Sequence, residues 1–169
     1  MGSDRLRQRG AFLVAALTAL MVQSCVYSFQ GNLPAHLESI AIPLVENQTA
    51  EYQINETITN LLTQQFLEEN ILRVENRENA DSVLEGVVTS IEDTPYTYDA
   101  AERVEEYRVD ITLQIRWYDG VQDKTRLEES VNGWGTYDAR QATTTREDGI
   151  AEAIDMIADK IINSITANW

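Results

Sequence analysis

One long stretch of strict alternation constrains the fold of this chain more than any other feature. Between Arg103 and Tyr118, apolar and polar side chains alternate. The apolar set is Tyr107, Val109, Ile111, Leu113, Ile115 and Trp117, and the polar set is Glu106, Arg108, Asp110, Thr112, Gln114 and Arg116. A two-residue period places each set on one face of a β-strand. This pattern predicts an antiparallel sheet with one buried face and one face in water.

Two other segments repeat their apolar residues every three or four positions, which is the period of a helix that buries one stripe. We expect Asn47 or Thr49 to cap the start of the first helix and Asn70 to end it. Thr144 and Glu147 have the spacing of a capping box at the start of the second helix. The stripes are Ile54, Ile58, Leu61, Leu62 and Phe66 in the first helix, residues 51–69, and Ile150, Ile154, Ile157, Ile161 and Ile165 in the second.

The remaining apolar segments predict shorter strands. They are residues 39–45, 82–92 and 126–137, with a short segment at 72–74 after the first helix. Pro43 cannot donate a ladder hydrogen bond, so we expect an edge strand or a bulge there. Pro95 is expected to end the strand before it, and residues 96–101 to form a connection. The turn signal Asp119-Gly120 predicts a hairpin whose loop is longer than two residues.

The predicted order of elements is β-α-β-β-β-α. Each helix has one apolar stripe and the sheet has one apolar face. The simplest arrangement lays both helices on that face of a mostly antiparallel sheet, giving an α+β fold of the two-layer α/β sandwich type. The other sheet face is then solvated or covered by a partner.

The first 25 residues predict a secreted protein with a lipid anchor. Three arginines precede a 12-residue apolar run, residues 11–22. Such a run suits a signal peptide and is too short for a membrane-spanning helix of about 20 residues. The only cysteine, Cys25, follows the small residue Ser24, which resembles the lipobox of bacterial lipoproteins. That resemblance implies cleavage after residue 24 and acyl chains on Cys25. An ordinary signal peptide that contains a cysteine is the alternative.

The chain after residue 24 is strongly acidic. It holds 10 basic and 27 acidic residues, a net charge of −17. This charge argues against binding nucleic acid, which depends on Lys and Arg at the phosphates. It also opposes contact with an anionic membrane unless a lipid anchor provides it, and several acyl chains make such an anchor stable. We expect a tether at residues 25–37 and one domain at residues 38–169.

Catalytic chemistry has little support in the sequence. His36 is the only histidine and falls in the predicted tether, so a Ser-His-Asp arrangement would depend on a mobile segment. An acylated Cys25 excludes a Cys-His pair. No phosphate-binding loop, dinucleotide fingerprint or zinc spacing is present. We therefore predict that the protein is not an enzyme and binds no cofactor or metal.

Four aromatic residues are candidates for partner contacts. Trp134 lies between two glycines, which suggests an exposed anchor or a close approach of another backbone. The alternative, which we favour, is a strand-end bulge whose tryptophan covers the edge of the core. Tyr96, Tyr98 and Tyr107 are further candidates because interfaces favour aromatic residues. For Tyr107, packing at the edge of the core is the preferred interpretation.

Two arginines are candidates for anion contacts. Arg108 and Arg116 fall on the predicted wet face, eight residues apart. A guanidinium group binds phosphate in a bidentate fork. In so acidic a chain, pairing with Glu or Asp on a neighbouring strand is the favoured alternative.

Several segments, in this order, resemble the lipopolysaccharide-assembly lipoprotein family LptE in its Bacteroidetes-like form. They are Cys25–Phe29 at the lipobox, Ser39–Pro43, Leu84–Ile91 followed by Thr94-Pro95-Tyr96, the long alternating strand, and Ala167-Asn168-Trp169. The resemblance covers nearly all of the chain after the signal. It implies an outer-membrane lipoprotein on the periplasmic side that plugs the β-barrel translocon LptD, assists its assembly and binds lipopolysaccharide.

The acidic charge departs from the basic side chains that the family uses for lipopolysaccharide. Candidate contacts to the barrel or to lipopolysaccharide are Arg108, Arg116, Trp134 and Tyr98, with Cys25 as the lipidation site. The alternative function is another lipoprotein of similar build, such as an activator of a peptidoglycan synthase or an accessory of a lipid-transport ABC system.

Overall fold

The computed structural model describes residues 33–140 and 142–167, so Cys25, residues 25–32 of the predicted tether and Trp169 lie outside the described residues. The elements in chain order are β1 (Ser39–Ala41), β2 (Glu46–Asn47), α2 (Ile54–Glu69), β3 (Arg73–Val74), β4 (Ser82–Tyr98), β5 (Val104–Asp119), β6 (Lys124–Asp138) and α3 (Arg146–Ala167). Among the described residues, no helix has the length and apolar character needed to cross a membrane.

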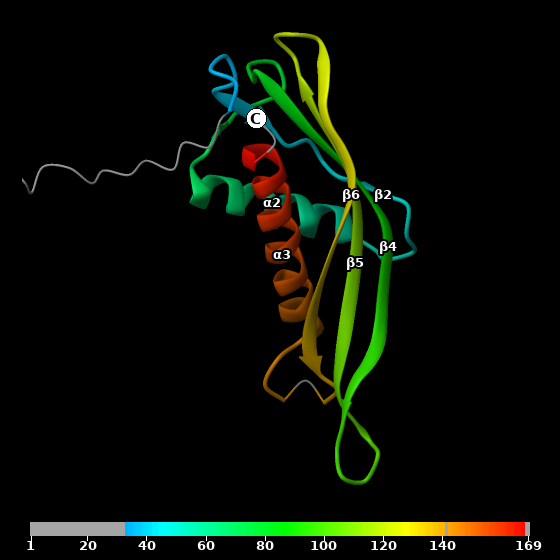
Figure 1. Cartoon of the computed structure of the whole chain (residues 1–169). Helices are drawn as coiled ribbons and strands as arrows, with labels where there is room; N and C mark the ends of the chain where they lie inside the picture. The colour runs from blue at the N-terminus through cyan, green and yellow to red at the C-terminus, as the bar shows by residue number, and fades with distance from the viewer. Residues whose placement is uncertain (1–32, 141, 168–169) are drawn as a thin grey trace, which may run out of the picture. The chain divides into compact units, whose positions relative to one another are not determined.

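The sheet is mixed, with its long strands antiparallel. Its order is β3-β1-β4-β5-β6, and β2 pairs with β4. The pairs β4–β5 and β5–β6 are antiparallel, whereas β1 and β2 run parallel to β4 and β3 runs parallel to β1. Both helices lie on one side of this sheet (Figure 1). The predicted α+β fold, with two helices packed on one sheet face, is confirmed.

The alternation in β5 produces the expected burial. Val109, Ile111, Leu113, Ile115 and Trp117 are almost fully buried. The isoleucine stripe of α3 joins them in the core, together with the α2 stripe apart from the half-buried Leu61. Each buried side chain of this size contributes about 1.5–3 kcal/mol to stability. The two-residue period thus directs one face of the sheet to the core and leaves the other open.

Two glycines of β6 allow α3 to lie directly against the strand. A Cβ atom on Gly133 would lie 2.1 Å from the carbonyl oxygen of Ala153, and one on Gly135 would lie 2.1 Å from that of Gly149. Both glycines are buried, and their register with β5 is regular. The favoured bulge at Trp134 is therefore wrong, because a regular strand turns Trp134 away from the core. The close backbone approach, given as one functional interpretation, is present.

The first predicted strand is interrupted at Pro43. β1 and β2 are separate short strands, both paired with β4, and β1 lies between β3 and β4. An edge strand was therefore the wrong expectation for the first half. Proline lacks the N–H group that a continuous ladder needs, and the chain leaves the ladder there.

β4 continues through Pro95 to Tyr98, so the predicted strand end and the connection at residues 96–101 are wrong. Beyond Val88 no described strand pairs with the outer side of β4, since the register of β2 ends at Asn47 opposite Val88. A proline costs little at such an edge because no neighbour requires its N–H. Register shifts next to Pro95 absorb the irregularity.

The predicted helix starts differ from those observed. Residue Gln53 precedes α2 with a left-handed φ of 60° and no side-chain cap, while Asn47 and Thr49 bond within the preceding turn. The capping pair of α3 is Thr145 with Asp148, one residue beyond the predicted pair, because Thr144 Oγ1 accepts a hydrogen bond from the β6 backbone. The end of α2 at Asn70 is confirmed, as is the hairpin loop of residues 120–123 between β5 and β6.

Candidate functional site

The open face of the sheet is the surface of β4, β5 and β6 that turns away from the helices. The register aligns its side chains in rows across the three strands. From one end to the other the rows are Glu85-Arg116-Glu128, Val87-Gln114-Ser130, Ser90-Thr112-Asn132, Glu92-Asp110-Trp134 and Thr94-Arg108-Thr136. The middle rows are uncharged, and charged or aromatic side chains lie on either side of them.

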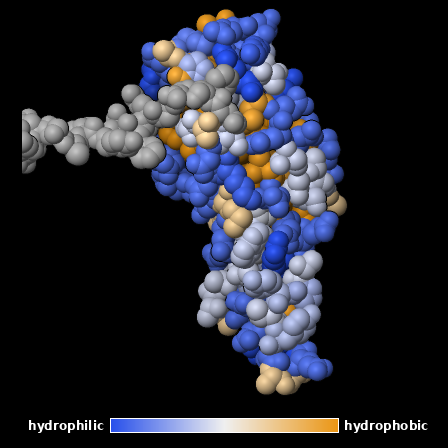
Figure 2. Space-filling view, viewed as in Figure 1, coloured by the Kyte–Doolittle hydropathy of each residue, from blue (hydrophilic) through white to orange (hydrophobic). Residues whose placement is uncertain are grey.

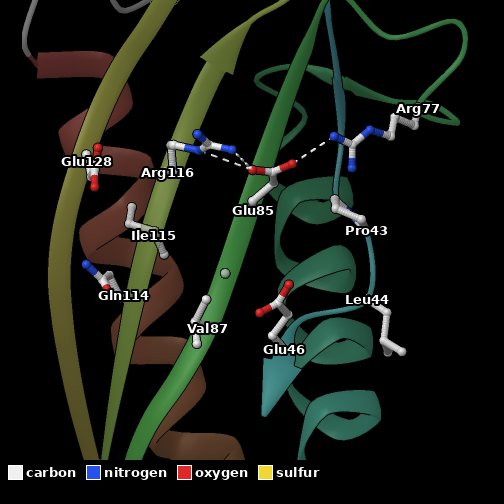
Figure 3. Close-up of a pocket in the computed structure, with 11 residues that line it drawn as sticks. Pro43, Leu44, Glu46, Arg77, Glu85, Val87, Gln114, Ile115, Arg116 and Glu128 are labelled. Carbon is white, nitrogen blue, oxygen red and sulfur yellow. Dashed lines mark hydrogen bonds and ion pairs between the residues drawn. The ribbon is translucent and has the colours of Figure 1, made fainter. Parts of the chain in front are cut away.

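The end of this face near the β5–β6 turn contains an open groove of about 520 Å³. Figure 3 shows Glu85 at its centre, between Arg116 and Arg77. Arg77 Nη2 donates to Glu85 Oε1 at 2.8 Å, and Arg116 Nε donates to Glu85 Oε2 at 3.1 Å. Hydrogen bonds from Arg116, and then Arg77, hold the pKa of Glu85 below its usual range, although burial opposes the shift. Pro43 and Leu44 form an apolar rim, and Leu44 is exposed.

The other end of the open face carries an aromatic cluster built on Trp134. The Arg108 guanidinium lies 4.8 Å from the Trp134 ring centroid, and the Tyr96 ring centroid lies 6.1 Å from that of Trp134. Arg108 also bonds Asp110, which is directly opposite Glu92 in the register. The Arg108 guanidinium therefore offsets repulsion between the facing carboxylates of Asp110 and Glu92. It also stacks on the Trp134 indole. Tyr98, 58% exposed, continues the aromatic surface toward the β4–β5 hairpin.

The structure places the four predicted contact residues on the same three strands but does not gather them. Arg108 and Trp134 are in contact, and Tyr98 lies further along β4. Arg116 is eight residues from Arg108 along β5, roughly 27 Å away at strand spacing. Both arginines pair with carboxylates. Arg116 bonds Glu85 across strands, which confirms the favoured interpretation for it, whereas Arg108 bonds Asp110 within its own strand, so a partner on a neighbouring strand was the wrong expectation there. Tyr107 is half-buried and stacks on Tyr137, as expected for the core edge.

His36 contacts the domain, in contrast to the mobile position that we expected. Its Nε2 lies 2.7 Å from Oδ2 of the fully buried Asp119, and Arg126 Nη2 donates to the same oxygen at 2.6 Å. Burial by itself raises the pKa of Asp119, but hydrogen bonds from His36, the Gln122 amide and Arg126 lower it to about 2. This cluster fastens residue 36 to the β5–β6 turn.

Sequence reasoning missed a second ionic cluster, at the start of α3. Arg146 Nη1 donates to Glu51 at 2.9 Å, and Arg146 Nη2 donates to Asp93 at 2.9 Å. Asp93 also accepts a hydrogen bond from the Tyr137 hydroxyl, and burial followed by this contact raises the pKa of Tyr137 to about 12. The three charged residues are far apart in sequence, and no pattern in it relates them. Glu85, in contrast, follows from the strand register once the β4–β5 hairpin is aligned.

This geometry has the features of a contact surface. The described residues hold no group of His, Cys, Asp and Glu arranged for a metal ion. The assembled charges are ion pairs, and the exposed aromatic side chains lie on an open sheet face. The fold and this face define a small α+β interaction domain.

The sequence comparison identifies the family. The family model LptE, described as lipopolysaccharide-assembly, matches residues 37–165, and the chain belongs to this family. Membership agrees with a protein that acts in lipopolysaccharide assembly by contact. No curated protein matches the chain in sequence.

Solved structures share the fold at low sequence identity. The hypothetical protein CT253 from Chlamydia trachomatis is similar with a TM-score of 0.56 and 11% identity, covering 78% of this chain and 99% of that one. A PelC dodecamer from Paraburkholderia phytofirmans, in a single-substitution variant, gives a TM-score of 0.51 and 16% identity, covering 80% and 93%. A putative lipoprotein from Caulobacter crescentus CB15 gives 0.50 and 15%, covering 73% and 88%. These similarities concern the fold alone.

Proposed function

We propose that this protein is an outer-membrane lipoprotein, anchored through Cys25 on the periplasmic side, that plugs the lipopolysaccharide translocon barrel LptD and helps it to assemble. The family match over residues 37–165 is the observation that carries the proposal. The match supports a role in lipopolysaccharide assembly, and the open face of the sheet offers a surface that a large partner could contact.

The open face has the character of a protein contact surface. Its centre is polar and uncharged, and Tyr96, Tyr98 and Trp134 provide aromatic side chains of the kind that anchor interfaces. An acyl anchor confines the domain to the membrane that holds the barrel. This raises the effective concentration of each partner, so that modest intrinsic affinity suffices.

Carboxylates of the domain itself compete with lipopolysaccharide for Arg108 and Arg116. Phosphate groups would have to displace Asp110 from the first arginine and Glu85 from the second. The net charge of −17 after residue 24 also repels an anionic ligand. We therefore assign the open face first to the barrel and keep direct lipopolysaccharide binding as a secondary part of the proposal.

Depletion of the protein tests this function. Correctly assembled barrel and surface lipopolysaccharide should fall together, while peptidoglycan synthesis continues unchanged. Unchanged barrel and lipopolysaccharide together with reduced cell-wall cross-linking would instead support an activator of a peptidoglycan synthase.

A matched pair of variants locates the contact surface. Trp134→Ala removes the centre of the aromatic cluster on the open face, and Leu67→Ala removes an exposed apolar side chain of α2 on the helix layer. We expect Trp134→Ala to lower the amount of barrel that co-purifies from solubilised outer membranes and Leu67→Ala to leave it unchanged. Equal recovery with both variants would remove the open face from the proposal.

A further inference from the structure

The outer edge of β6 is one end of the sheet, because β6 pairs with β5 on one side and with no described strand on the other. The direction of its backbone groups follows from three contacts to α3 and the segment before it. Thr136 N–H donates to Glu152 at 3.0 Å, Asp138 N–H donates to Thr144 at 3.0 Å, and Lys160 donates to the Asn132 carbonyl at 2.7 Å. Even-numbered residues from 132 to 138 thus direct their N–H and C=O groups outward, as alternation in an antiparallel strand requires.

These contacts protect only part of the edge. They occupy outward groups at residues 132, 136 and 138. The same alternation directs the backbone groups of Glu128 and Ser130 outward, and neither residue has a backbone partner on that side among the described residues. We call this stretch, from Glu128 to Val131, the open edge. Unpaired strand edges of this kind accept an added strand unless charge, proline or a covering element prevents it.

A groove of about 360 Å³ lies beside the open edge. It is lined by residues 129–132 of β6 and by Lys160, Asn163 and Ser164 of α3. Figure 2 shows patches of apolar surface in the upper half of the view with hydrophilic residues around them. Of the residues that line the groove, only Val131 is apolar. An edge strand next to a helix groove is the arrangement in which extended segments bind by strand addition. The backbone provides hydrogen bonds, and alternate side chains enter the groove.

The charge of the groove indicates the chemistry of its occupant. Glu129 makes no hydrogen bond or ion pair within the described part of the chain, whereas Lys160 is engaged by the Asn132 carbonyl. The chain after residue 24 carries a net charge of −17, which disfavours a second copy of itself as the occupant. We infer that the open edge of β6 receives an extended segment of the barrel partner that carries lysine or arginine, added antiparallel or parallel as a further strand. This inference rests on the proposed function.

Amide hydrogen exchange in the native complex tests the inference. The full-length lipoprotein is purified alone and in complex with the barrel that it retains from solubilised outer membranes. Strand addition predicts that exchange at Ser130 slows by about tenfold or more in the complex. The inward amides of Glu129 and Val131, already paired with β5, should change little. This alternating pattern would not result from general shielding of the surface.

Two variants provide a second measurement. Ser130→Pro removes the outward N–H, at an edge position where the β5 ladder does not use it, and Ser130→Ala keeps it. We expect Ser130→Pro to reduce barrel recovery several-fold and Ser130→Ala to retain it. If Ser130→Pro fails to fold, the exchange pattern of the wild type still decides.

The outcomes separate the two proposals. A wild-type protein that retains no barrel refutes the proposed function and this inference with it. A stable barrel complex in which Ser130 exchanges as fast as in the free protein refutes strand addition alone. Protection that appears in the isolated protein and increases with its concentration would assign the open edge to a second copy, which also overturns the inference.

Discussion

The contact between α3 and β6 offers a direct test of the packing. In Gly135→Ala, the new Cβ would lie 2.1 Å from the carbonyl oxygen of Gly149 and 2.8 Å from the Cβ of Glu152. Atoms of this kind pack at roughly 3.5 Å, so α3 must move away from β6 by about 1 Å. The nearest atom belongs to the backbone, so no change of rotamer can relieve the contact.

The movement lowers stability because it separates α3 from the core side chains of the sheet. α3 carries the isoleucine stripe that fills the core between the helix and the sheet, and Ile150 and Ile154 flank the contact. Overpacking a core costs about 1–3 kcal/mol. Because the whole helix must move, we expect Gly135→Ala to lower the free energy of unfolding by about 3 kcal/mol, the upper end of this range. For a domain of this size, that corresponds to a decrease in Tm of about 10–15 °C.

Thermal unfolding of the full-length protein, followed by circular dichroism, measures the effect. Gly86→Ala in β4 is the matched control, since its Cβ would lie 3.3 Å from a Val45 methyl group, which can move. We expect the control to remain within about 1 kcal/mol of wild type. If Gly135→Ala unfolds at the wild-type temperature, α3 does not approach β6 as closely as described.

Three further predictions concern the core, the buried carboxylate and the anchor. Ile157→Asp places a carboxylate at a fully buried position of α3 and should cost several kcal/mol, seen as a large fall in Tm; an unchanged Tm would show that the stripe is not packed. In the folded state the pKa of Asp119 is lowered from 3.8 to about 2, so its ionised form stabilises the fold above pH 3.8. About 2 kcal/mol of this stability should be lost as the pH falls from 3.8 to below about 2. Acid unfolding of Asp119→Asn should lack this component, and identical acid dependence in both proteins would contradict it. Mass spectrometry of the native protein should find Cys25 at the N-terminus with acyl chains, and an unmodified thiol would refute lipidation.

The sequence predicts most reliably where a short-range pattern decides the structure. The two-residue period of β5 correctly separates its buried and open faces, since the pleat leaves no other choice. The isoleucine period does the same for α3. The alternation also places Arg108 and Arg116 on the open face, although it does not identify their partners.

The sequence-based predictions are wrong where the local structure depends on a segment that is distant in the sequence. A proline would end a strand that has neighbours on both sides, but no described strand lies outside β4 at Pro95, and β4 continues through it. The prediction of a bulge at Trp134 took its glycines as a sign of irregularity, whereas they accommodate the backbone of α3. His36 bonds Asp119, 83 positions away in sequence. In each case the missing information is which segment lies alongside, and no local pattern contains it.

The acidic charge of this domain constrains how it would occupy the proposed barrel. Several carboxylates on the open face and in the turns are already paired, as Glu85 is with two arginines and Asp119 with Arg126. The net charge nevertheless remains strongly negative, so the acidic residues outnumber the basic residues that could pair with them. Enclosure in a low-dielectric wall would make unpaired charges costly, whereas a wall bearing lysine and arginine would make them favourable. A partner that encloses this domain, as the proposed barrel would, is therefore expected to present positive charge toward it.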